Sequence, residues 1–215
     1  MKKFSLAAVL VLLIVLVGCT KETPAEYFDY EKDDNHIIIT GLVKTDLEKI
    51  VIPERLEGSF VTEIKAEAFE DCTSLKNVTI PDSVEVIGSY AFEGCTSLTS
   101  VTIPDSVKEI DYRAFADCTS LTNVTIPDSV TEMWGCVFEG CTSLKNIILS
   151  ESLKYIMEDA FNGCTSLTSV TIPDSVTNIM WRAFAGCTSL TNVTIPDSVE
   201  YIASDAFEGT GVKLP

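Results

Sequence analysis

The sequence predicts a repeat solenoid, mainly β, in which 23-residue units stack and short irregular or 3-10 return arms connect their strands. Three observations predict this fold class. Phenylalanine recurs every 23 residues from Phe69 to Phe207. A nearly identical sequence surrounds each of these phenylalanines, and every unit has the same length. A unit this short cannot bury its apolar face alone and must stack on its neighbours. The architecture favours binding over catalysis.

The N-terminus has the features of an exported protein. Two lysines precede an apolar run over residues 6–17, which is typical of a secretory signal and short for a membrane span. The phrase LVGC at residues 16–19 resembles a bacterial lipobox, whose cysteine is lipidated after cleavage. We therefore expect a lipoprotein signal peptide over residues 1–18 and a lipidated Cys19 with its tether over 19–26. The alternative is an ordinary signal peptide that contains a cysteine.

Residues 27–64 are expected to form the N-terminal cap and the first coil. Residues 27–36 are polar and aromatic. This composition suits a cap over the open end of the core, because the outer face of a terminal repeat is exposed to solvent. Residues 37–64 carry the landmarks of a unit with a longer turn. The array then occupies residues 65–215, and residues 209–215 are expected to form a shortened final strand.

Within one unit, CTSLTSVTIPDSVKEIDYRAF from Cys95 to Phe115, each element has a physical reason. Leu98, Val101 and Ile103 follow the L-x-x-L-x-L spacing of a leucine-rich repeat, so the last two point inward from a strand. Proline ends that strand because it lacks the N–H for a further ladder bond, and Asp-Ser after it favours a turn onto the return arm. The phenylalanine ring then fills the core and closes the coil.

The units resemble the BspA-type, or treponemal-type, leucine-rich repeats of bacterial surface proteins. The resemblance covers about residues 37–214 and depends on unit length and on the phrases IPDSV, AF and CTSL. It implies a surface-exposed protein that adheres to host matrix and plasma proteins, such as fibronectin and fibrinogen, or to other bacteria. The alternative function is that of a structural or antigenic coat lipoprotein without a dedicated ligand.

The charge of the chain restricts its partners. A net charge of −17 and a pI near 4.3 disfavour nucleic acid and anionic bilayers, since both repel an acidic surface. We expect contact with a membrane only through the lipid on Cys19, and protein partners otherwise.

Cysteines recur with the same period and are predicted to be small buried hydrophobes. Equivalent side chains on successive coils run parallel, whereas a disulfide needs Cβ vectors turned toward each other. Cys136 lies off this column, which leaves two interpretations: an exposed thiol capable of intermolecular pairing, or neutral drift. The periodic cysteines are Cys72, Cys95, Cys118, Cys141, Cys164 and Cys187.

No motif predicts an enzyme, a cofactor or a metal centre. The sequence contains no G-x-S-x-G phrase or Gly-rich phosphate loop, and its only histidine, His36, stands far from the periodic cysteines. The aspartate that follows each proline is assigned to the turn, with structural calcium as the alternative.

The units differ mainly in the three residues before each Ala-Phe pair, where both tryptophans of the protein fall. Trp, Tyr, Met and Arg are enriched at binding hot spots, whereas neutral drift on an exposed arm is the competing explanation. A recognition surface along this edge would use Tyr90, Tyr112, Arg113, Trp134, Trp181 and Arg182. The alternative binding site is the concave strand face around Thr125, Ile148 and Thr171.

Overall fold

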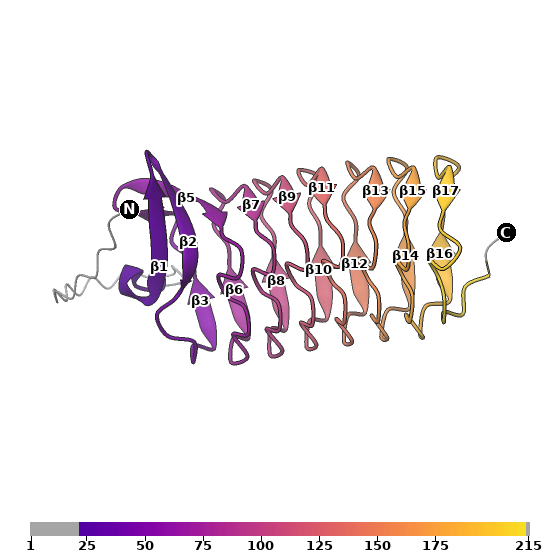
Figure 1. Cartoon of the computed structure of the whole chain (residues 1–215), viewed down its shortest axis with the longest axis horizontal. Coiled ribbons are helices and arrows are strands. Elements are labelled where there is room, and N and C mark those ends of the chain that lie inside the picture. The colour runs from indigo at the N-terminus through magenta and orange to yellow at the C-terminus, as the bar shows by residue number, and fades with distance from the viewer. Residues whose placement is uncertain (1–21, 214–215) are drawn as a thin grey trace, which may run out of the picture.

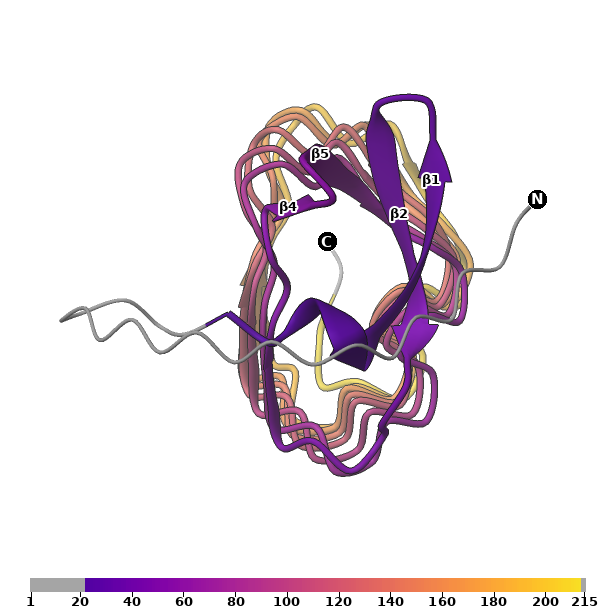
Figure 2. The same ribbon diagram turned by 90° about the vertical axis from the view of Figure 1, so that its left-hand side faces the viewer.

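The computed structural model describes residues 22–213 as a β-solenoid of about 7 turns with almost no helix. The coils lie side by side in one row, from β1 at one end to β16 and β17 at the other (Figure 1). Viewed along this row, they superpose around a single elongated core (Figure 2). Among the described residues, no helix has the length and apolar character needed to cross a membrane. The predicted solenoid is confirmed.

Two hairpins form the N-terminal end of the array. The first pairs β1 and β2 antiparallel and lies at the edge of the sheet, with Phe28, the first residue of β1, buried in the core. The second pairs β4 with β5, and β2 runs parallel to β5. Their bounds, after the 3-10 helix η1 (Ala25–Tyr27), are β1 (Phe28–Asp33), β2 (His36–Leu42), β4 (Arg55–Leu56) and β5 (Ser59–Ile64).

One strand of each coil belongs to a parallel sheet that we call the threonine sheet. Its strands have three residues, of which the middle one packs into the core while its two neighbours face solvent, except that Val51 in the first strand is also buried. This alternation is the period of two that the sequence predicted. The strands are β3 (Lys49–Val51), β6 (Asn77–Thr79), β8 (Ser100–Thr102), β10 (Asn123–Thr125), β12 (Asn146–Ile148), β14 (Ser169–Thr171) and β16 (Asn192–Thr194).

The return arms are more regular than predicted, because each contains a two-residue strand. These strands form a second parallel face, the return sheet, which continues from β5. The bond from the Asp111 N–H to the Ile87 carbonyl (2.9 Å) and the equivalent bond from Trp134 to Ile110 (3.0 Å) connect successive arms. Its strands are β7 (Val86–Ile87), β9 (Glu109–Ile110), β11 (Glu132–Met133), β13 (Tyr155–Ile156), β15 (Asn178–Ile179) and β17 (Tyr201–Ile202).

The periodic phenylalanines form a continuous ring stack through the core. Neighbouring centroids are 5.0 Å apart for Phe69 and Phe92 and 5.7 Å apart for Phe138 and Phe161, with nearly parallel planes. At the predicted Pro-Asp-Ser turn, the valine N–H donates to the proline carbonyl, as Val107 does to Pro104 at 3.1 Å. Stacking, turn and ladder thus repeat together in successive coils.

Both sheets are interrupted at the most divergent unit. In the described part of the chain, no backbone pairing joins β11 to β13 or β12 to β14. This unit has Ser150 where other units have proline, and Leu153 where other units have a smaller valine. The Ser150 hydroxyl is buried and donates to the Val130 carbonyl at 2.7 Å. The phenylalanine stack continues across this interruption.

Candidate functional site

The outward side of the return sheet carries the large exposed side chains. In the arms up to β15 the second strand residue, such as Ile110 or Ile156, is buried in the core, and Ile202 in β17 is half-buried. The residues on either side of it therefore face outward, since side chains alternate along a strand. Four aromatic side chains on this face and at the turn after it are at least 40% exposed: Trp134, Tyr155, Trp181 and Tyr201. We call this side of the molecule the return face.

The six predicted contact residues do not all reach solvent. Tyr112, Trp134, Trp181 and Arg182 are exposed, whereas Tyr90 and Arg113 are half-buried. Tyr90, Arg113 and Arg182 also share a left-handed backbone, with φ of 60°, 56° and 54°. That conformation turns the chain back toward the phenylalanine, so variation at this position affects the coil as well as its surface.

Cys136 is not an exposed thiol, and that interpretation is wrong. Its side chain is 6% exposed. The nearby Cys136 thiol, followed by burial, raises the pKa of Tyr112 to about 12, and burial raises the pKa of Cys136. Tyr112 in turn packs edge-on against Tyr90, with ring centroids 5.6 Å apart. The three side chains form one cluster across successive coils.

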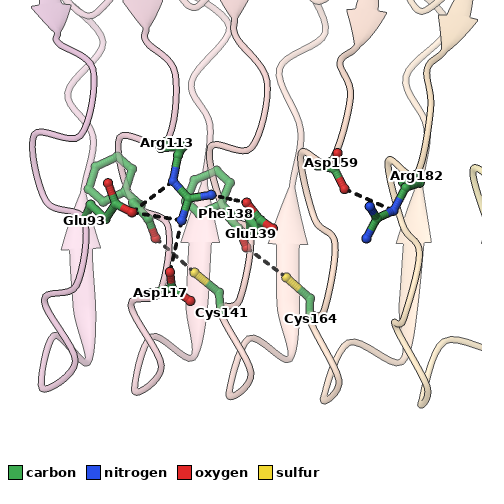
Figure 3. Close-up of polar contacts among 10 residues, drawn as sticks. Glu93, Arg113, Asp117, Phe138, Glu139, Cys141, Asp159, Cys164 and Arg182 are labelled. Atoms are coloured by element: carbon green, nitrogen blue, oxygen red, sulfur yellow. Dashed lines mark hydrogen bonds and ion pairs between the residues drawn. The ribbon is translucent and has the colours of Figure 1, made fainter.

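Arg113 lies among three carboxylates instead of pointing to solvent (Figure 3). Its guanidinium contacts Glu93 at 2.8 Å, Asp117 at 3.1 Å and also Glu139, and only 20% of the side chain is exposed. Burial opposes its charge, but the hydrogen bond to Glu93 and the three acidic neighbours outweigh this and raise its pKa. Arg182, at the equivalent position, is half-exposed and pairs with Asp159 at 3.4 Å.

An acidic group occupies the return face next to the first exposed tryptophan. Glu109 and Glu132 are register neighbours on β9 and β11, and Glu109 accepts a hydrogen bond from the Trp134 indole N–H at 2.8 Å. Burial, then the charges of Glu109, Glu63 and Glu132 and a hydrogen bond to Glu109, raise the pKa of Asp111 to about 6. Within residues 22–213, no cation lies within 4.0 Å of these four carboxylates.

Neutralising Asp111 should stabilise the fold at neutral pH. The folded-state pKa lies above that of the unfolded chain, so the ionised carboxyl opposes folding above about pH 6, and this cost disappears as the pH falls toward 4. Because solvent screens the group, we expect Asp111→Asn to add about 1 kcal/mol to the free energy of unfolding at pH 7.5. Urea unfolding at pH 7.5 and 4.5 measures the difference. Asp174→Asn, in an exposed turn, is the control; equal gains from both variants would contradict the argument.

Sequence reasoning missed the acidic and methionine residues of this face. The return arm was taken as irregular, so the outward positions of a strand were not sought there. The available signal was the alternation of Glu109-Ile110-Asp111 and of Tyr155-Ile156-Met157, with an apolar residue between two outward ones. The missed residues are Glu109, Asp111, Glu132, Met157 and Met180.

The alternative strand face has only a shallow hollow. Thr125 and Ile148 line this depression of about 480 Å³, together with Thr102 and Asn123. Ile148 is 63% exposed among polar neighbours. Thr171 is exposed on β14, beyond the point where this sheet is interrupted. The three alternative residues therefore lie on contacting neighbouring strands, and two of them line the hollow around one isolated apolar side chain.

The periodic cysteines are free and buried, as predicted. Each of five thiols also donates to a phenylalanine carbonyl of the preceding coil: Cys141 to Phe115 and Cys164 to Phe138, both at 3.2 Å, are drawn in Figure 3. Burial raises the pKa of Cys141 far above its ordinary value. The column thus supplies hydrogen bonds between coils as well as apolar packing.

We expect these thiols to be unreactive toward thiol reagents in the folded protein. The thiolate is the reactive form, and burial suppresses it while blocking access. A thiol-reactive chromophore at pH 8 should label none of the seven described cysteines within minutes, and all seven after denaturation in urea. Fast labelling of Cys136 in the native state would contradict its burial beneath Tyr112.

Comparisons with known proteins agree with this geometry. The family profile described as "BspA type Leucine rich repeat region" matches six copies, over residues 42–135, 62–187 and 113–214. The chain belongs to the BspA-type leucine-rich repeat family. A solved leucine-rich repeat protein of T. pallidum is 37% identical with a TM-score of 0.81, and the alignment covers 85% of this chain and 86% of that one.

Two further solved leucine-rich repeat proteins extend the likeness. A leucine-rich repeat protein from Bacteroides ovatus is 27% identical with a TM-score of 0.69, over 90% of this chain and 58% of the other. One from Eubacterium ventriosum, 23% identical with a TM-score of 0.62 over 78% and 60% of the two chains, shares the fold. No curated protein sequence matches.

The BspA-type repeat fold is typically a non-enzymatic binding scaffold. Among residues 22–213, no group of three or more His, Cys, Asp or Glu side chains could hold a metal ion. Cys19, the predicted lipidation site, lies outside the described residues. The described residues of this scaffold present exposed aromatic rings and carboxylates on its return face, an arrangement suited to recognition.

Proposed function

We propose that this protein is a protein-binding module, exported and lipid-anchored through Cys19 at the bacterial cell envelope, where it acts as an adhesin for host or matrix proteins. One observation carries the proposal: exposed aromatic side chains gather on the return face of a rigid scaffold. Such side chains bring large contact area with few torsions to immobilise. Membership in a family associated with surface adhesion supports the cellular setting.

Binding to immobilised fibronectin, fibrinogen and whole matrix extract tests this function. We expect the combined Tyr112→Ala, Trp134→Ala and Trp181→Ala variant to lose most of the binding while circular dichroism shows an intact fold. The matched control replaces Thr125, Ile148 and Thr171 with alanine on the threonine sheet. Loss of binding in the control alone would move the site to that sheet. Binding to none of these proteins would overturn the adhesin and favour the coat lipoprotein.

Lipidation and exposure are tested separately on cells. We expect Cys19→Ala to abolish metabolic labelling with a fatty-acid analogue, and external protease to digest the protein on intact cells. A protein that is shielded from protease would contradict the role in adhesion.

A further inference from the structure

We propose that the return face binds an extended peptide segment that has basic residues at one end and apolar residues at the other. The proposal depends on the proposed protein-binding function and specifies the chemistry of the partner. The basic end would lie over β9 and β11, and the apolar end over β13 and β15.

The carboxylates at one end of the face have no cation of their own. Glu109, Asp111 and Glu132 project from two adjacent arms, and Glu63 on β5 lies in the same register column as Glu109, two strands away. The bordering lysines are engaged elsewhere, Lys65 with Glu31 at 2.9 Å and Lys108 with Glu85. Carboxylates held together without a counter-charge weaken the fold, and a cationic ligand would relieve that repulsion.

The other end of the face is aromatic and apolar. Tyr155 is exposed and Met157 and Met180 are half-buried, so the outward columns continue from the carboxylates into a mainly apolar strip whose polar member is Asn178 on β15. Trp134 joins the two parts: its N–H is bound to Glu109, which fixes the ring beside the carboxylates. A fixed, exposed indole offers its π face to a Lys or Arg side chain.

The spacing of the coils sets the length of the segment. The phenylalanine rings of these four successive coils have centroids 5.5, 5.7 and 5.2 Å apart, so the arms from β9 to β15 span roughly 16 Å. An extended chain covers that distance with about five residues. The segment would therefore cross the strands along the axis of the array, with one or two residues above each coil.

Three capped synthetic peptides test the proposal on the chain from residue 22 onward. The first has the proposed chemistry, Arg-Lys-Arg-Gly-Leu-Phe-Leu. In the second, Glu and Asp replace the basic residues, and in the third, Ser and Asn replace the apolar ones. The protein has only two tryptophans, Trp134 and Trp181, so intrinsic fluorescence reports directly on this face. We expect the first peptide to bind at least about tenfold more tightly than either of the others.

Charge variants locate the binding site. We expect Glu109→Gln, Asp111→Asn and Glu132→Gln together to weaken the first peptide about tenfold or more. The control removes the same charge from turns of other coils, with Asp82→Asn, Asp174→Asn and Asp197→Asn, and should change affinity less than about twofold. Acidification from pH 7.5 to 5.5 should weaken binding of the first peptide to the wild type, and should weaken it less for Asp111→Asn. The reason is that Asp111 becomes protonated among Glu63, Glu109 and Glu132, while the bordering lysines keep their charge.

The outcomes separate this proposal from the proposed function. Equal binding of the basic and acidic peptides, both lost in Trp134→Ala, would overturn the basic preference and leave the return face as a protein-binding surface. Peptide binding that neither the charge variants nor Trp134→Ala and Tyr155→Ala reduce would overturn both. Binding of no peptide, while matrix proteins still bind through the tryptophans, would overturn only the segment chemistry.

Discussion

Phe138→Ala should lower the free energy of unfolding by about 3–5 kcal/mol. The ring is fully buried and stacks on Phe115 and Phe161, at centroid distances of 5.5 and 5.7 Å. Its removal leaves a cavity between two rings and weakens both interfaces of one coil. In a solenoid each coil contacts only its neighbours, so no other part of the protein compensates for the loss. The midpoint and slope of urea unfolding measure the effect.

Two phenylalanines act as internal controls. Phe207 is the last ring of the described stack and packs on one neighbour, Phe184, so Phe207→Ala should cost clearly less than Phe138→Ala. Phe60 lies outside the stack, is 38% exposed and has Arg55 over its ring. Phe60→Ala should therefore cost about 1 kcal/mol or less. Similar losses from all three variants would show that the stack has no special role.

The period of the sequence predicted the scaffold well because stacking repeats the same physical constraint in every coil. The buried phenylalanines and cysteines, the inward valines and the turn at each proline recur at fixed positions, so a single unit describes its neighbours. The return strands were not predicted because each has only two residues, so the alternation around each of them is a weak signal within one unit. Their strand character comes from hydrogen bonds between coils, such as that from Asp111 to Ile87.

The candidate site was only partly predictable, because its geometry depends on side chains from different coils. Exposure of Trp134 and Trp181 followed from their place in the variable segment. The burial of Cys136 beneath Tyr112 did not, since the tyrosine comes from the preceding unit. The interruption of the sheets at the unit with Ser150 was not predictable either, because a changed turn residue does not show whether the neighbouring strands still pair.

Arg113→Ala should destabilise the fold by about 1–3 kcal/mol, because it leaves Glu93, Asp117 and Glu139 together without their shared cation. Arg182→Ala is the matched control: the arginine has the same left-handed backbone but one longer ion pair and a half-exposed side chain, so the loss should stay below about 1 kcal/mol. High salt should reduce the loss in Arg113→Ala, as it screens the carboxylates from one another. At a temperature where Arg113→Ala remains folded, its affinity for matrix proteins should equal that of the wild type. Weaker binding by this folded variant would instead make Arg113 a contact residue, as the sequence first indicated.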